Sequence, residues 1–225
     1  MRTLAMTVAG VVLAASLAHG QDRARYRDYQ LGGDVPSISA LSGVARSEIK
    51  TLHERPAVMQ ELQWRRRYSA TGAAQTDPVQ QIVFSFYNDQ LSKMVVDYDH
   101  DRTAGMTDLD MIEGISQAYG PQLAVARKPR AVSAPLEEES GTLLARWGDA
   151  DYSVVLYRSS FASGFRIIVT SPRLEALART ADAEAIRLDQ REAPQREVAR
   201  QKKEAEDSRA SEDKARAANK AVFRP

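Results

Sequence analysis

The 225-residue sequence contains no cysteine. This absence excludes disulfide bonds, thiol catalysis, cysteine-based zinc sites and iron–sulfur clusters. The sequence also lacks an excess of charge of either sign, because its 31 basic and 30 acidic residues nearly cancel. A dedicated nucleic-acid binder shows a net basic field, so we expect no nucleic-acid partner.

Long apolar runs are equally scarce, and the longest lies at the N-terminus. Residues 4–18 are uncharged, follow the basic start Met1-Arg2-Thr3 and lead into Ala18-His19-Gly20. This order is typical of a secretory signal peptide with a small-residue cleavage site. The run has about 15 residues, whereas a transmembrane helix needs roughly 20. We therefore predict a signal peptide over residues 1–20, cleaved before Gln21, with an uncleaved anchor as the alternative.

Cleavage predicts an exported protein, periplasmic or extracellular, without a transmembrane span. No cysteine follows the apolar run, so we expect no lipid anchor. About 205 of the 225 residues remain, enough for one domain of ordinary size and an extension.

The mature chain shows the order β-β-β-α twice. A short capped helix comes first, with Asp34 as its N-cap and Gly43 as its left-handed end. Runs rich in β-branched and aromatic residues then predict strands. The expected strands span residues 58–68, 79–87, 91–98, 141–147, 152–157 and 165–170. The expected helices begin at Thr107, with a capping box to Asp110, and at Ser171-Pro172.

These patterns predict an α+β fold with an antiparallel sheet built from two β-β-β-α units. The domain is expected to span residues 21–194, with an internal duplication over about 30–120 and 141–193. Trp64 and Trp147 lie in the first strand of their respective units. The predicted core comprises Leu41, Trp64, Ile82, Phe84, Val95, Ile112, Ile115, Val154, Leu156, Ile167 and Leu177.

Residues 195–225 form a charged tail, and we expect Pro194 to break the helix before it. Between Gln195 and Lys220, Val198 is the one sizeable aliphatic residue. Alanines and oppositely charged residues at helical spacing favour a helix. The repeated large apolar residues of a coiled-coil seam are missing. The tail is therefore predicted to be a solvated helix or disordered, with a coiled-coil dimerisation arm as the competing view.

One acidic cluster is a candidate metal site. Asp97, Asp99 and Asp101 alternate along the chain, and three convergent carboxylates suit calcium. Arg102 stands where a calcium loop needs glycine, and no helix is predicted before the cluster. The alternative is a polar strand end in solvent, which we prefer. The two histidines of the mature chain, His53 and His100, are too few for a transition-metal site without a carboxylate.

The layout of residues 30–98 resembles exported modules of the β-lactamase-inhibitor-protein-like class. The resemblance rests on the short helix between Leu31-Gly32 and Leu41-Ser42-Gly43, followed by antiparallel strands carrying Trp64. It implies a protein-binding module and not an enzyme. The chain departs from that class by lacking cysteines for disulfides or lipidation.

No catalytic or cofactor motif stands out, so we expect no cofactor. Our first hypothesis is an exported, non-enzymatic, protein-interaction or envelope-associated module that binds another envelope or secreted protein. The second is a metal-dependent hydrolase that uses the Asp97–Asp101 cluster, including His100 as a base. A concave pocket beside these side chains would favour the second hypothesis.

Overall fold

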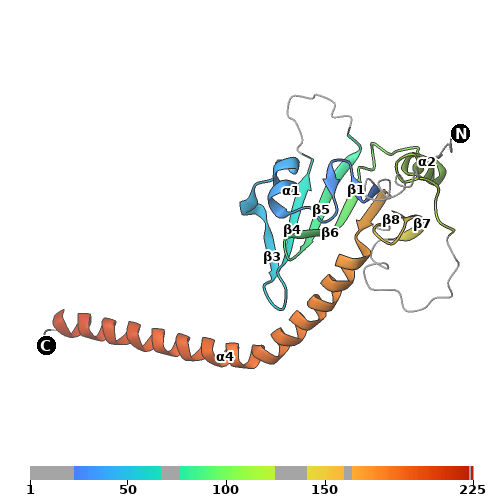
Figure 1. Cartoon of the computed structure of the whole chain (residues 1–225). Coiled ribbons are helices and arrows are strands. Elements are labelled where there is room, and N and C mark those ends of the chain that lie inside the picture. The colour runs from blue at the N-terminus through green and yellow to red at the C-terminus, as the bar shows by residue number, and fades with distance from the viewer. Residues whose placement is uncertain (1–22, 67–76, 125–140, 160–163, 223, 225) are drawn as a thin grey trace, which may run out of the picture. The chain divides into compact units, whose positions relative to one another are not determined.

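The computed structural model describes residues 23–66, 77–124, 141–159, 164–222 and 224. The predicted signal peptide, residues 1–20, lies outside the described residues. The chain divides into two units, Met1–Ala178 and Arg179–Pro225. The first unit contains an antiparallel sheet with two shorter helices, so the predicted α+β class is confirmed (Figure 1).

The main sheet has seven strands in the order β3-β4-β5-β6-β9-β8-β7, and each strand is antiparallel to its neighbours. The six predicted strands are all present, and their ends differ from the predictions by a few residues. The strands are β3 (Lys50–His53), β4 (Met59–Arg65), β5 (Val79–Tyr87), β6 (Gln90–Tyr98), β7 (Thr142–Gly148), β8 (Ser153–Arg158) and β9 (Phe165–Thr170).

Both predicted helix caps are present. Helix α1 (Val35–Ser42) starts where the Asp34 side chain accepts a hydrogen bond from the backbone N–H of Ser37, and it ends at Gly43 with φ 68°. Helix α2 (Asp108–Tyr119) has the reciprocal capping box between Thr107 and Asp110. These local hydrogen bonds satisfy backbone donors that a helix start otherwise leaves free.

Three strands were not predicted. A small hairpin of β1 (Arg25–Tyr26) and β2 (Tyr29–Gln30) precedes α1. The third is β3, which follows a 3₁₀ turn (Arg46–Glu48). Because β3 is an exposed edge strand of four residues, it has no buried side to produce an apolar alternation.

The main sheet has an approximate twofold arrangement about its central pair, where Val95 of β6 lies opposite Ile168 of β9. Strands β5 and β4 continue the sheet on one side of this pair and β8 and β7 on the other, and β3 adds an edge strand beyond β4. The residues in register are Val96, Ile82 and Trp64 on one side, and Val169, Val154 and Trp147 on the other. The two tryptophans therefore occupy equivalent positions, while a duplication of the sequence stays a prediction.

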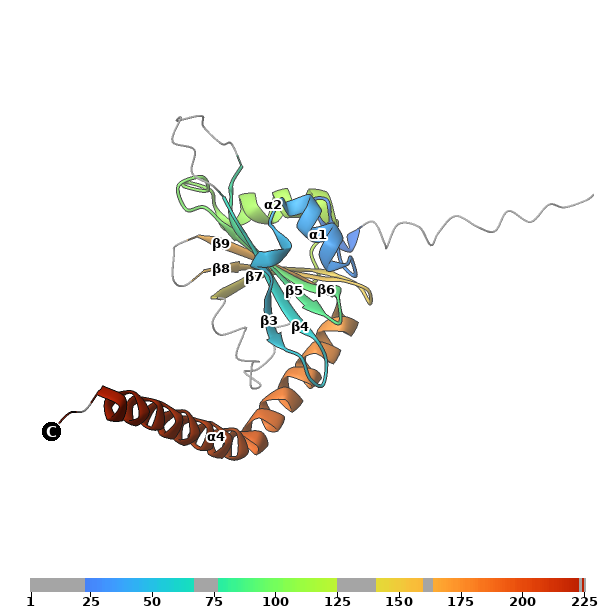
Figure 2. The same ribbon diagram turned by 90° about the vertical axis from the view of Figure 1, so that its left-hand side faces the viewer.

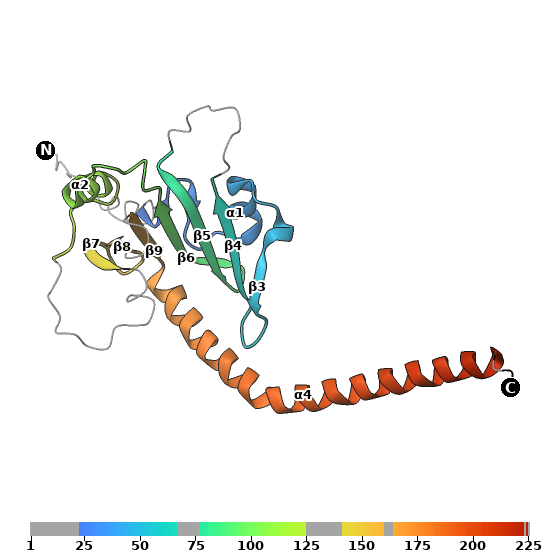
Figure 3. The ribbon, with the colours of Figure 1, turned by 180° about the vertical axis from the view of Figure 1, so that it is seen from behind.

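Helices α1 and α2 lie on the same side of the sheet, as Figure 2 shows. In the view from behind, α1 lies beyond the strands (Figure 3). Strand residues that alternate toward this side are buried, and Trp147 donates from its indole N–H to the Ser116 hydroxyl of α2 at 3.1 Å. Six residues of the predicted core are buried, as expected: Ile82, Phe84, Ile115, Val154, Leu156 and Ile167.

Two predicted core residues are wrong, because Leu41 is 54% exposed and Leu177 is 44% exposed. Helix α1 buries Val35, Ile38 and Ser39, so Leu41 lies outside its buried stripe. In the last helix, the buried Leu174 and Ala178 are one turn apart, and Leu177 falls beside that line. The remaining predicted members are only partly buried: Trp64, Val95 and Ile112.

Helix α4 runs from Pro172 to Val222 and contains Pro194. The predicted break at Pro194 is wrong, since the helix continues through it. Proline removes one backbone hydrogen bond and crowds the carbonyl four residues earlier. Here the residues around Pro194 are exposed, so water can solvate the freed carbonyl, and good helix formers lie on both sides.

The part of α4 beyond Pro194 is polar on all sides. Every described residue from Ala193 to Val222 is exposed. Arg200 bonds Glu197 one turn before it and Glu204 one turn after it, at 2.7 and 2.9 Å. Among the helices that the structure describes, none is long and apolar enough to cross a membrane.

We predict that deleting residues 195–225 leaves the melting temperature of the domain almost unchanged. The deleted segment buries too little apolar surface to stabilise the domain. Differential scanning calorimetry of the mature and truncated chains is the measurement. A dimer in sedimentation that disappears on deletion would contradict this expectation and favour the coiled-coil arm.

Candidate functional site

The predicted acidic cluster lies at the end of β6, and its three carboxylates have different surroundings. Asp97 lies on the strand and accepts a hydrogen bond from Nε of Arg166, on the neighbouring β9, at 2.6 Å. Both side chains are partly buried. The positive charge of Arg166 therefore already compensates the negative charge of the Asp97 carboxylate.

Asp99 is the buried member of the cluster. One carboxylate oxygen accepts a hydrogen bond from the Arg66 guanidinium, and the other accepts one from the backbone N–H of Arg102 at 3.1 Å. Burial raises the pKa of the Asp99 carboxyl, but the hydrogen bonds from Arg102 and Arg66 outweigh it, so the net pKa is lowered. Asp99 is therefore ionised near neutral pH and paired with arginine.

Asp101 and His100 lie in the exposed turn that follows. Among the residues that the structure describes, no group of three or more histidine, aspartate or glutamate side chains is placed to hold a metal ion. The structure thus brings Asp97 and Asp99 to arginines rather than to one another. The calcium site stays a prediction from the sequence.

We expect a calorimetric titration of the mature protein with calcium to show no binding heat. Asp97 and Asp99 would have to give up their arginine partners to bind the ion. Zinc is titrated in parallel, because His100 adjoins the cluster. A saturable calcium signal that disappears in Asp97→Asn would restore the metal site and the hydrolase hypothesis with it.

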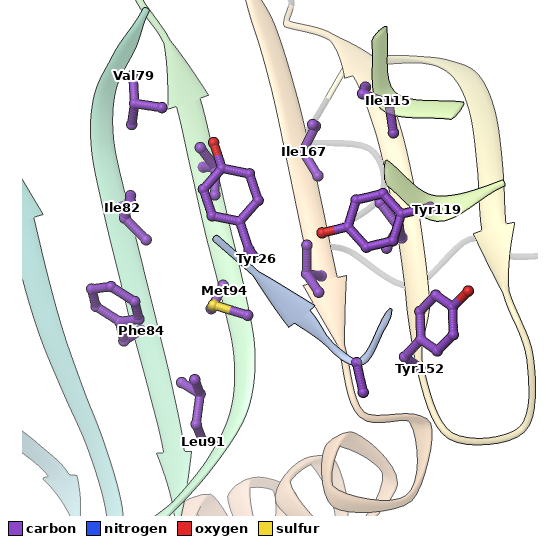
Figure 4. Packing of buried hydrophobic residues seen from close by; sticks show 14 of the residues in the cluster. Tyr26, Val79, Ile82, Phe84, Leu91, Met94, Ile115, Tyr119, Tyr152 and Ile167 are labelled. Atoms are coloured by element: carbon purple, nitrogen blue, oxygen red, sulfur yellow. The ribbon is translucent and has the colours of Figure 1, made fainter. Parts of the chain in front are cut away.

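A separate, apolar cavity lies between α2 and the sheet. Its volume is about 430 Å³. Two methionines, two aliphatic residues of α2 and one residue of β9 form most of its apolar wall. These are Met106, Met111, Ile115, Ala118 and Ile167. Figure 4 shows Ile115 and Ile167 near one another, with Tyr26 and Tyr119 in the same region.

Three tyrosines from three elements contribute hydroxyl groups to the lining of the cavity. The hydroxyls of Tyr26 (β1) and Tyr98 (β6) share a hydrogen bond of 3.3 Å. The Tyr119 hydroxyl, from α2, donates to the backbone carbonyl of Arg25 at 2.6 Å. Burial raises the pKa of all three phenols, most strongly that of Tyr98. They are therefore neutral hydrogen-bonding groups at physiological pH.

Two charged residues line the cavity, and each has a partner elsewhere. Arg27 makes a bidentate ion pair with Asp77, with both N–O distances 2.7 Å. Asp110 accepts from the backbone N–H and the hydroxyl of Thr107 in the capping box, and these bonds lower its pKa. The interior of the cavity is therefore apolar, and the two charged side chains at its border are bonded to other residues of the protein.

Little in the sequence indicates this cavity. Tyr26 and Tyr98 lie 72 residues apart along the chain. Only the folded hairpin of β1 and β2 brings them together.

Comparison with known protein families, with curated proteins and with solved structures finds no match for this chain. The resemblance to β-lactamase-inhibitor-protein-like modules therefore stays a prediction from the sequence.

Proposed function

We propose that the mature protein is an exported, non-enzymatic interaction module of the cell envelope. In this proposal, the part of α4 beyond Pro194 contacts another envelope or secreted protein. The exported location rests on the signal-peptide pattern of residues 1–20. The interaction role rests on α4 itself.

The observation that carries the proposal is the second half of a long helix, which has no apolar side. Helix α4 has 51 residues, which corresponds to about 75 Å of helix at 1.5 Å per residue. From Ala193 onward its side chains are exposed, and ion pairs of the Arg200 type run along it. A helix that is polar on all sides typically extends through solvent between two contact sites, and such ion pairs stabilise it.

The charge pattern of this segment also limits its partner. Basic and acidic residues are interspersed from Arg196 to Lys214, so this stretch offers neither a polybasic surface for anionic lipid nor an acidic one. A protein surface with interspersed charges of both signs can match it through several ion pairs. Its recognition should therefore weaken as ionic strength rises.

Site-specific photo-crosslinking tests the proposal. A photoreactive amino acid is placed at Val198, which is 66% exposed, and in a control at Leu109 of α2, which is 75% exposed. We expect light-dependent coupling to one envelope or secreted protein from Val198 only. Equal products from both positions, or none from Val198, would contradict the proposal.

A charge-swapped variant separates recognition from helix stability. Exchanging the charges in Glu197→Arg/Arg200→Glu/Glu204→Arg keeps both ion pairs one turn apart but reverses their direction. We expect the crosslinked product to fall several-fold while circular dichroism shows unchanged helix content. A pull-down from envelope extract, with and without residues 195–225, gives an independent measure.

A further inference from the structure

We propose that the cavity beneath α2 binds a neutral, mainly apolar small molecule that carries one hydrogen-bond acceptor. The cavity has a volume of about 430 Å³, within the roughly 300–1,000 Å³ typical of ligand pockets. Its apolar lining and its few convergent polar groups have the composition of such pockets.

The charges around the cavity indicate that the ligand is neutral. Arg27 is held by both carboxylate oxygens of Asp77, and Asp110 is held by Thr107. A charged ligand would lose its hydration without gaining a free counter-charge, and that desolvation is costly. A neutral ligand has no such cost.

The tyrosine pair supplies the hydrogen bond to the ligand. Tyr26 and Tyr98 each carry one hydroxyl proton, and their shared bond uses one of the two. The second proton is available for an acceptor inside the cavity. Because burial keeps both phenols neutral, this donor persists over the physiological pH range. A carbonyl or ether oxygen on the ligand would accept it.

Gly114 leaves open space on the α2 side of the cavity. It lies within α2 on the cavity lining, and a Cβ built on it meets no atom within 4 Å. Alanine would fit there and would stabilise the helix, because glycine is the costlier residue in a helix interior. Gly114 is exposed, so the space beside it is open to solvent, and a larger side chain there can extend over the mouth of the cavity.

The two methionines adapt the cavity to ligand shape. Met111 is buried in the wall, whereas Met106 is 39% exposed. Methionine side chains are flexible and polarizable, and they pack well against aromatic rings. This wall, together with the three phenol rings, favours a flat aromatic molecule over a purely aliphatic one.

The test uses the neutral fluorescent ketone 6-propionyl-2-(dimethylamino)naphthalene and the mature protein. Its carbonyl can accept the tyrosine proton, and its emission shifts to the blue in an apolar site. We expect saturable, one-to-one binding with a blue shift. Absence of a saturable signal would overturn the proposal.

Three variants locate the bound dye. Gly114→Leu should fill the open space and weaken binding by about tenfold or more while the protein keeps its melting temperature. The double variant Tyr26→Phe/Tyr98→Phe removes both hydroxyl donors and should weaken binding by about fivefold, the effect of one hydrogen bond. Leu109→Ser removes an exposed apolar side chain of α2 and should change nothing. Full binding in both cavity variants, or loss in Leu109→Ser, would overturn the site.

The charge requirement has its own comparison. The sulfonated dye 8-anilinonaphthalene-1-sulfonate is aromatic and of similar size but carries a negative charge. We expect it to bind at least tenfold more weakly than the neutral ketone. Equal or tighter binding of the sulfonate would contradict the assignment of a neutral ligand. The crosslinking at Val198 reports on a different segment, so the two proposals can fail independently.

Discussion

Replacing Phe84 with alanine is expected to lower the free energy of unfolding by about 3–5 kcal/mol. Phe84 is fully buried at the centre of β5, between Leu62 of β4 and Met94 of β6. Its ring also meets the Tyr29 ring edge-on, with centroids 4.7 Å apart. Removing the ring forfeits its transfer free energy and leaves a cavity that the two neighbouring strands cannot collapse to fill.

The adjacent residue provides a matched control. Val83 lies on the same strand but points to the other side of the sheet, where it is only half-buried. We expect Val83→Ala to cost about 1 kcal/mol, mostly through reduced β-propensity. Urea denaturation, with the slope compared between variants, measures both changes. Similar losses for the two variants would show that the sheet buries both sides equally, contrary to this structure.

The first unit was largely predictable because its signals are local. The hairpin of β5 and β6 follows from residues that alternate toward the core and from Asn88 and Asp89, which adopt positive φ in the turn. The caps at Asp34 and Thr107 follow from side chains that bond to backbone three residues away. Each of these features is determined within about ten residues.

What the sequence did not predict depends on distant parts of the chain. The β1–β2 hairpin has two residues in each strand, too few for a pattern, and it is fixed by contacts such as the Tyr119 hydroxyl on the Arg25 carbonyl. The apolar cavity needs Tyr26, Tyr98 and α2 at once. Leu41 and Leu177 were misplaced because a single helical spacing fits two adjacent stripes, and only packing chooses between them.

The acidic cluster shows the same limit. Alternation correctly placed Asp97 on a strand, but nothing in the local pattern showed that Arg166 would lie beside it. Arg66 and Asp99 are 33 residues apart in the sequence and meet only when β4, β5 and β6 pair. The arginine partners of these two carboxylates thus come from β9 and from the residue that follows β4.

We expect Asp99→Asn to be strongly destabilising, with a loss of about 3–5 kcal/mol at neutral pH. The Arg66 and Asp99 side chains are only 9% and 12% exposed. The variant would remove the carboxylate that pairs with the buried Arg66 guanidinium, and removing one partner of a buried ion pair costs more than the pair itself contributes. Asp99 also joins three segments, through Arg66, the backbone N–H of Arg102 and the carbonyl of Pro78, which accepts the Asp99 N–H.

Asp101→Asn is the control, because Asp101 is an exposed neighbour in the same turn. A surface change of this kind normally stays within about 0.5 kcal/mol. The double variant Arg66→Met/Asp99→Asn removes both charges, so its loss should be smaller than the sum of the two single losses. If Asp99→Asn were as stable as Asp101→Asn, the Arg66–Asp99 pair would not support the fold.

The dependence on pH gives a second, independent check on Asp99. Its carboxyl has a lowered pKa in the folded state, whereas an aspartate in the unfolded chain has a pKa of about 3.9. The folded protein therefore holds its carboxylate more strongly than the unfolded chain does. This stabilisation is complete above the unfolded pKa and is lost as pH falls through the lower folded pKa. The stability difference between the wild-type protein and Asp99→Asn should then be constant from pH 7 to about pH 5 and should shrink below about pH 4. Urea denaturation at pH 7, 5 and 3 measures it, and a difference that grew on acidification would contradict the assigned ion pair.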